Sequence, residues 1–165
     1  MAVMRQVVLV DIAMELPASH PYLVLREVDQ PWREMRIPIG LPDGVAIAYA
    51  WRGLATPRPL SHELFADILG RLDVSLAMVH ITEARGQAYF AELTLVGAST
   101  HVVPCRPSDA IALALRQPLP VPILVTEDLL GPPAEAQTPE AQTPEAQTPE
   151  AQTPAAGAPE ESSGG

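Results

Sequence analysis

The stretch RPSDAIALALR, from Arg106 to Arg116, sets a polar cluster directly against six apolar residues. Ala110 to Leu115 is apolar on every side, which predicts a helix buried in the core. Pro107 suits the first helical position, because its missing N–H donor is no loss there. Ser108 and Asp109 can cap this helix and complement its positive end.

Arg106 is the residue of this stretch that helix capping does not explain. It can pair with Asp109 or with a carboxylate elsewhere in the chain, or it can contribute to an anion site at the start of the helix. The residues alone leave both interpretations open.

The elements around this helix come in blocks of one type. The period-two and period-3.6 patterns predict three strands, two helices, three strands, a helix and a strand. This order favours a single α+β domain with a mixed sheet over a doubly wound parallel fold. The expected strands are Val7–Met14, Tyr22–Val28, Glu34–Ile39, Ser75–Thr82, Gln87–Val96, His101–Pro104 and Val121–Val125, and the expected helices are Asp43–Trp51, Ser61–Leu69 and Pro107–Leu115.

Two of these elements have a clear apolar side. In the second helix, Leu64, Phe65, Ile68 and Leu69 form one stripe, with Ser61 as the expected N-cap and Gly70 as the expected stop. In the strand that contains Phe90, we expect Tyr89, Ala91, Leu93 and Leu95 on one face, and Phe90, Glu92 and Thr94 on the other.

The last part of the chain differs in composition from the rest. From Glu135 to Pro154 the unit EAQTP repeats four times in register, and the only charges there are negative. Such a segment cannot bury enough apolar surface to offset the entropy lost on ordering. The sequence therefore predicts a globular domain over residues 1–131 and a disordered acidic tail over 132–165.

The charge balance limits how the domain can meet a nucleic acid. The chain has ten arginines, no lysine and a formal net charge of −10, which argues against a basic binding face and makes any phosphate contact local.

Cys105 is the only cysteine, so it has no intrachain disulfide partner and suits a reducing compartment. No apolar run reaches the length of a membrane helix, and the apolar N-terminal run is interrupted by Asp11 and Glu15. We expect a cytoplasmic protein that does not enter membranes.

Several polar residues outside the opening stretch need weighing. His62 and Glu63 begin like a zinc-binding H-E-x-x-H helix, but Ala66 stands where the second histidine is required. Asp43 is most simply a helix cap, and Arg58 a solvated loop charge. A metal site would need carboxylates from separate segments to converge.

Four ordered motifs resemble those of the bifunctional nuclease domain family, which is also classed as a domain of unknown function. The resemblance covers nearly all of residues 1–131. It implies an α+β domain that tends to form homodimers, and the plant members of the family are described as nucleases acting on DNA and RNA. The motifs are IGLPDGVAIAYAWRG (Ile39–Gly53), RPLSHELFADIL (Arg58–Leu69), RGQAYFAEL (Arg85–Leu93) and RPSDAIALALR, and their key positions are Asp43, Arg58, His62, Arg106, Ser108 and Asp109.

The chain departs from the family pattern at three places. Asp43 stands where glutamate is usual, and Glu63 stands where aspartate is usual, so these two changes keep the charge. Pro38 replaces a tryptophan, which removes an aromatic surface able to stack on a base or to pack a dimer contact.

Two hypotheses follow, from different functional classes. The first is a nuclease that hydrolyses phosphodiester bonds of DNA or RNA with a divalent cation such as Mg²⁺ or Mn²⁺. The second is a non-catalytic interaction or regulatory module, dimeric through the same fold, in which the same polar residues cap helices and stabilise the subunit interface. For the nuclease, the predicted catalytic residues are His62, Asp109 and Asp43, the phosphate-binding residues Arg58, Arg106 and Ser108, and the metal ligands Asp43, Glu63 and Asp109.

Overall fold

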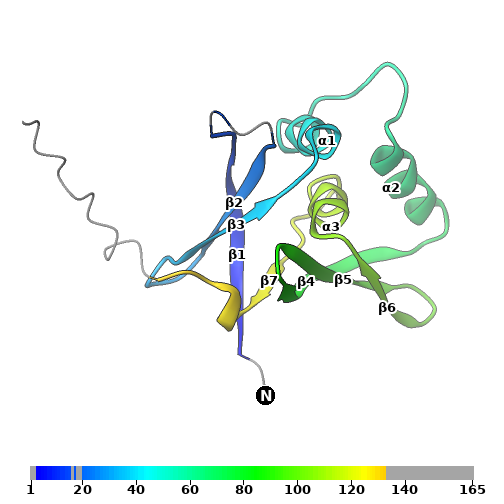
Figure 1. Cartoon of the computed structure of the whole chain (residues 1–165). Helices are drawn as coiled ribbons and strands as arrows, with labels where there is room; N and C mark the ends of the chain where they lie inside the picture. Colours follow the sequence, from blue (N-terminus) through cyan, green and yellow to red (C-terminus); the bar gives the residue numbers. More distant parts are fainter. Residues whose placement is uncertain (1–2, 16, 18–19, 133–165) are drawn as a thin grey trace, which may run out of the picture.

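A seven-stranded mixed sheet and three α-helices make up the domain (Figure 1). The computed structural model describes residues 3–15, 17 and 20–132. The sheet is strongly twisted, so that β1 runs across the direction of β4 and β5 in Figure 1. The elements are β1 (Met4–Ala13), β2 (Tyr22–Glu27), β3 (Glu34–Pro38), α1 (Leu41–Trp51), α2 (Ser61–Arg71), β4 (Ser75–Arg85), β5 (Ala88–Val96), β6 (Thr100–Cys105), α3 (Pro107–Ala114), β7 (Ile123–Thr126) and the 3₁₀ turn η1 (Glu127–Leu129).

The last strand joins the two halves of the sheet. The strand order is β3-β2-β1-β7-β4-β5-β6. β7 pairs antiparallel with β1 through Val7 and Ile123, and parallel with β4 through Val79 and Ile123. The other neighbouring strands pair antiparallel. The predicted α+β class, the mixed sheet and the order of elements are confirmed.

The central helix α3 lies on the sheet, as its apolar sequence predicts. It packs on β4 and β5, and α1 and α2 pack against it. Every residue from Ala110 to Ala114 is buried, and Ile111 has no exposed surface. Because an all-round apolar helix needs cover on every side, the two flanking helices complete the core around it.

The β4–β5 hairpin confirms the expected alternation of faces. Ala91 and Leu93 are buried, and Tyr89 and Leu95 are partly buried against the same core. β4 continues through Arg85, so the turn is shorter than the sequence predicts. Gly86 lies in it with a φ of 63°, a conformation that favours glycine.

The helix ends differ from the predicted caps. Gly40 precedes α1, so Asp43 lies inside its first turn, and Leu60, not Ser61, precedes α2. Gly70 lies within α2, and the chain leaves the helix at Asp73, which has a φ of 54°. Aspartate is one of the few residues that tolerate this left-handed region, which explains why no glycine is needed.

At the start of α3, Pro107 takes the first helical position as predicted, but Arg106 is the N-cap residue. No side chain makes a capping hydrogen bond there. The prediction that Ser108 and Asp109 cap this helix is therefore wrong as far as hydrogen bonding is concerned, and both side chains are left for other contacts.

The predicted tail comprises residues 132–165, and from residue 133 onward it lies outside the described residues. Its disorder therefore stays a prediction. Within residues 3–15, 17 and 20–132, no helix has both the length and the apolar character that crossing a bilayer requires.

A partly buried ion-pair network ties the N-terminal strands to η1. Glu27 is 4% exposed and accepts hydrogen bonds from Arg33 Nε at 3.0 Å and Nη2 at 2.8 Å. Arg33 Nη2 also donates to Glu127 at 2.7 Å, and Arg5 Nη2 donates to the same carboxylate at 2.9 Å. The hydrogen bonds from Arg33 lower the pKa of Glu27 and Glu127, although burial opposes the shift.

We expect this network to make the domain less stable in acid. A carboxyl whose pKa is lowered by folding contributes stability that is fully present above its unfolded pKa, about 4.5 for glutamate, and is lost as the pH falls through the folded value. The free energy of unfolding should therefore fall as the pH drops below about 4.5, and Glu27→Gln should make that fall shallower. Urea unfolding over a series of acidic buffers measures it, and equal slopes for the variant and the wild type would contradict the account.

Candidate active site

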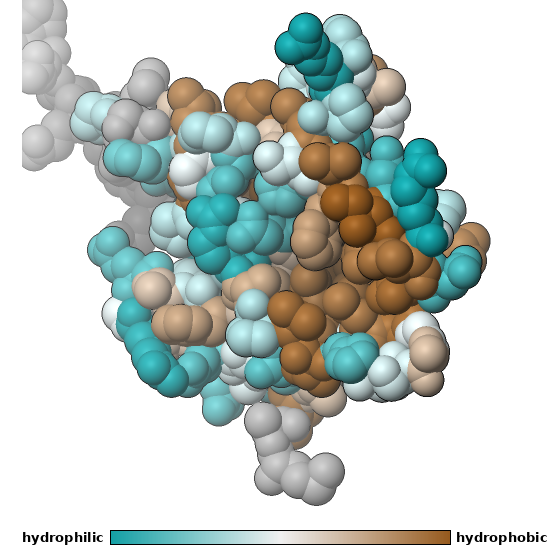
Figure 2. All heavy atoms as spheres, turned by 90° about the vertical axis from the view of Figure 1, so that its right-hand side faces the viewer, coloured by the Kyte–Doolittle hydropathy of each residue, from teal (hydrophilic) through white to brown (hydrophobic). Residues whose placement is uncertain are grey.

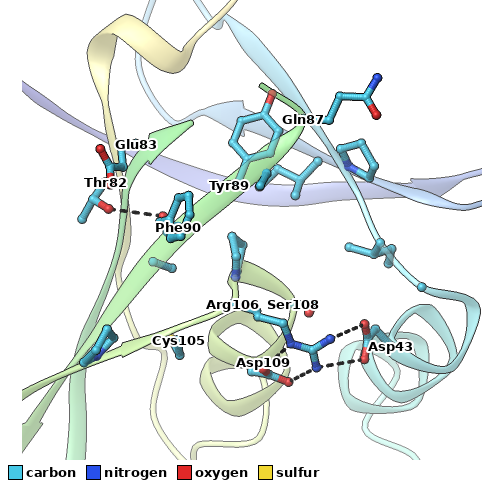
Figure 3. A pocket seen from close by; sticks show the side chains of 18 of the residues that line it. Asp43, Thr82, Glu83, Gln87, Tyr89, Phe90, Cys105, Arg106, Ser108 and Asp109 are labelled. Carbon is cyan, nitrogen blue, oxygen red and sulfur yellow. Dashed lines mark hydrogen bonds and ion pairs between the residues drawn. The ribbon is translucent and has the colours of Figure 1, made fainter. Parts of the chain in front are cut away.

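A large open cavity lies where the β4–β5 hairpin faces the first turns of two helices (Figure 3). Its volume is about 1180 Å³. The walls come from the end of β3, the start of α1, the hairpin and the start of α3. The polar residues in its lining at the starts of α1 and α3 are Asp43, Arg106, Ser108 and Asp109.

Arg106 links two carboxylates at this cavity. It donates to Asp109 from Nε and Nη2, each at 2.8 Å, in a bidentate pair. Its contacts to Asp43 are longer, 3.3 Å from Nη1 and 3.5 Å from Nη2. The side chain of Arg106 is nevertheless 64% exposed. A guanidinium has five N–H donors, so at least one remains for a ligand.

Asp109 is also held by a residue of α2. His62 Nε2 lies 3.0 Å from Asp109 Oδ1, and the histidine side chain is 18% exposed. Partial burial raises the pKa of Asp109, but the hydrogen bonds from Arg106 and His62 outweigh it and keep that pKa below its ordinary value. Asp109 is therefore a carboxylate at neutral pH, with both oxygens in use.

His62 itself is not part of the cavity wall. The histidine therefore acts on the cavity through Asp109.

Ser108 is the buried polar residue of the cavity. It is 5% exposed and lines the cavity beside Arg106. Within the described part of the chain its hydroxyl makes no hydrogen bond, and Figure 3 draws no contact to it. A hydroxyl that lines the cavity and has no protein partner can bond a ligand that enters it.

Glu63 lies in a different place from the two aspartates. It lines a second cavity of about 430 Å³. Its carboxylate accepts hydrogen bonds from Thr56 Oγ1 at 2.6 Å and from the Leu60 N–H at 2.7 Å, and it pairs with Arg116 Nη1. The Thr56 hydrogen bond lowers the pKa of Glu63 most. This carboxylate closes the first turn of α2 and neutralises Arg116, whose side chain is 12% exposed.

The three predicted metal ligands, Asp43, Glu63 and Asp109, therefore do not lie together. The structure brings Asp43 and Asp109 together across Arg106 but leaves Glu63 outside. Within residues 3–15, 17 and 20–132, three or more His, Cys, Asp or Glu residues do not converge in a way that could hold a metal ion.

Arg58 is also separate from the cluster. It lies in the exposed loop between α1 and α2, and neither cavity has it in its lining. Its backbone carbonyl accepts a hydrogen bond from Thr56. The structure therefore does not place Arg58, one of the predicted phosphate-binding residues, at the cavity with Arg106.

The sequence-based reasoning missed the aromatic side of the cavity. Tyr89 and Phe90 both line it, and so does Cys105. Burial raises the pKa of the Cys105 thiol to about 11, so it stays protonated at neutral pH. The signal for the aromatic wall was present in the motif RGQAYFAEL, which places Tyr89 on the core-facing side of β5.

Comparisons with known proteins agree with the sequence motifs. A family model described as "Bifunctional nuclease domain" matches residues 23–137. An uncharacterized protein of Mycobacterium tuberculosis (strain ATCC 25618 / H37Rv) is 38% identical over 127 residues, which is 77% of this chain and 74% of that protein.

Two plant proteins are more distant. "Bifunctional nuclease 1" of Arabidopsis thaliana is 28% identical over 110 residues, 64% of this chain and 34% of the plant protein. "Bifunctional nuclease 2" of the same plant is 29% identical over 110 residues and is covered to 33% of its length. The family match covers most of the described domain, including all the residues of the Asp43–Arg106–Asp109–His62 cluster, and the chain belongs to the bifunctional nuclease domain family.

Proposed function

We propose that this protein is a nuclease that hydrolyses phosphodiester bonds at the cavity between the β4–β5 hairpin and the helix starts. The observation that carries the proposal is Arg106, an exposed guanidinium fixed between Asp43 and Asp109. A prepositioned guanidinium stabilises the charge that a phosphate develops in the transition state.

Each residue of the cluster has a separate task in this proposal. Arg106 contacts a non-bridging phosphate oxygen with its free N–H, and the Ser108 hydroxyl donates to a second oxygen. Asp43 is the more weakly held carboxylate, since its contacts to Arg106 exceed 3.2 Å, and it is the candidate to accept a proton from water. His62 is a positioning residue, because it holds Asp109, which in turn holds Arg106.

A divalent cation fits part of this arrangement. Mg²⁺ is commonly held by one or two carboxylates together with phosphate oxygens, and Asp43 and Asp109 are two carboxylates at one cavity. Arg106 already neutralises both, so a cation would compete with its guanidinium. A bound Mg²⁺ or Mn²⁺ would add Lewis-acid stabilisation of the phosphate.

The proposal is tested by cleavage of labelled RNA and of single- and double-stranded DNA by the full chain in Mg²⁺, in Mn²⁺ and in EDTA. Cleavage is expected from the wild type and is expected to be lost in Asp43→Asn, which keeps the size of the side chain but removes the proton acceptor. Equal cleavage by the wild type and Asp43→Asn would show that Asp43 takes no part in the mechanism. Cleavage that persists in EDTA would show that the reaction needs no divalent cation.

The second candidate, an interaction module, is favoured by a separate observation. The apolar stripe of α2 turns mostly outward, since Leu64, Phe65 and Ile68 are exposed and only Leu69 is buried. Figure 2 shows a broad hydrophobic area on the side of the molecule where α2 and β6 lie. β6 is an edge strand, with exposed Val102 and Val103.

A second copy of this chain suits that surface. Edge strands and exposed apolar stripes are usually covered in native proteins. A stable interface needs about 800 Å² from each partner, so the exposed face of α2 and the edge strand β6 would both have to take part. The two candidate functions do not exclude each other, because the cavity and this surface use different residues.

The dimer is tested by placing a charge in the surface. Phe65→Glu should convert a dimer to a monomer in sedimentation equilibrium, because a buried unpaired carboxylate in an apolar interface is costly. Asp67→Asn, on the same helix, is the control and should leave the mass unchanged. A monomeric wild type would contradict the dimer.

A further inference from the structure

We infer that the cavity binds an unpaired nucleotide of a single-stranded nucleic acid, with its base against Tyr89 and its phosphate at Arg106. The inference rests on the proposed function and specifies the substrate class of the same site. Its carrying observation is that one cavity has an aromatic and apolar wall opposite a single exposed guanidinium.

The ring of Tyr89 is held in one orientation. The ring is partly buried against the core, which fixes its orientation. In the described part of the chain its hydroxyl has no hydrogen-bond partner. Figure 3 shows the ring on one side of the space and the Arg106 guanidinium on the other. A ring that is held by packing and open on one side can stack with any base, because every base has a π-face.

The surroundings of Tyr89 extend this apolar wall. Ile37, Pro38 and Ile39, at the end of β3, line the same cavity, as does Ala88 next to Tyr89. None of these four neighbours is aromatic, so Tyr89 supplies the ring of this part of the wall. Phe90 lines the cavity too, but Arg85 stacks on its ring at 5.1 Å from the centroid.

Only an unpaired base can use such a wall. In a duplex both faces of each base are covered by its stacked neighbours, and the outside presents sugar and phosphate. A duplex would therefore reach Arg106 and leave the apolar wall exposed to water. The volume of about 1180 Å³ exceeds that of a typical small-ligand pocket, about 300–1,000 Å³, and can hold a nucleotide unit.

The charges that line the cavity also favour a single strand over a duplex. Glu83 and Glu92 line it along with Asp43 and Asp109, and among the described residues of the lining Arg106 is the one arginine. Duplex DNA carries one negative charge for about every 1.7 Å of its axis, which these carboxylates would repel. A flexible single strand can place one phosphate at Arg106 and turn the next ones away. One contacted phosphate predicts a shallow dependence on salt, with a slope of roughly −0.7 in log affinity against log salt.

The test is fluorescence anisotropy of the full chain in EDTA, so that binding is measured without cleavage. The probes are a short labelled single-stranded DNA and the duplex formed by annealing its complement. We expect the single strand to bind at least about tenfold more tightly, and Tyr89→Leu to weaken that binding by about tenfold. Tyr89→Phe should bind like the wild type, because the hydroxyl has no partner to lose. Tyr49→Leu, on α1 and outside the cavity, is the matched control and should also bind like the wild type.

Each outcome separates this inference from the proposed nuclease. Equal binding of single strand and duplex, full binding by Tyr89→Leu, or no binding by the wild type would overturn the inference, and cleavage in the presence of a cation would still support the nuclease. Single-strand binding that depends on Tyr89, without cleavage under any condition, would support the inference and overturn the nuclease. If Tyr89→Leu fails to fold, the strand preference and salt slope of the wild type decide the question.

Discussion

Arg106→Ala is expected to lower kcat/KM for cleavage of RNA and single-stranded DNA by about 10²–10³-fold. The magnitude is that of losing one prepositioned donor to a transition-state oxyanion. The substitution removes the free N–H that faces the ligand and also the bidentate pair that fixes Asp109. Arg106→Lys should recover only part of the activity, because a lysine ammonium cannot hold a carboxylate in the same planar, two-point geometry.

The fold should survive this change. The Arg106 side chain is 64% exposed, and ion pairs of exposed side chains contribute little stability, about 0–1 kcal/mol. A thermal melt checks this, and Arg52→Ala, a removal of an exposed arginine outside the cavity, is the control for the loss of one positive charge. Unchanged kcat/KM in a folded Arg106→Ala protein would leave the ion-pair cluster as a purely structural feature.

Ile111→Ala is expected to lower the free energy of unfolding by about 2–5 kcal/mol. Ile111 has no exposed surface and lies in α3, which packs on β4 and β5 and is flanked by α1 and α2. A cavity left at this position cannot be filled by collapse of a single neighbour, because the side chains around it belong to separate elements.

Denaturant unfolding of the full chain measures this loss. Leu119→Ala is the control, because Leu119 is 75% exposed and its truncation should change the free energy of unfolding by no more than about 0.5 kcal/mol. Equal losses for the two variants would show that α3 is not the centre of the core.

The sequence predicts those features that depend on local pattern. The buried α3 follows from an apolar run without a polar side, and the two faces of β5 follow from its alternation. The pairing of Arg106 with Asp109 was one of two open interpretations, since the residues are one helical turn apart. The helix ends were missed, because Gly70 continues a helix that Asp73 ends, and no local rule selects between them.

The sequence does not predict which residues of the site contact each other when they are far apart in the chain. Asp43 and Arg106 are 63 residues apart, and His62 and Asp109 are 47 apart. The family motifs name these residues but do not say which of them meet. Glu63 illustrates the difference, because it neighbours His62 in sequence yet turns to Arg116.

The sequence does not predict that the apolar stripe of α2 is exposed, for a similar reason. Amphipathic spacing predicts that an apolar face is covered, but not whether the same chain or another one covers it.

The measurement that tests the central claim most directly is nuclease activity across a gel-filtration profile of the full chain, run beside Asp109→Asn purified in the same way. The account predicts that cleavage of single-stranded substrate follows the protein peak of the wild type and is absent from the same peak of the folded variant. Cleavage that elutes away from the protein peak, or that is equal in the Asp109→Asn peak, would contradict it.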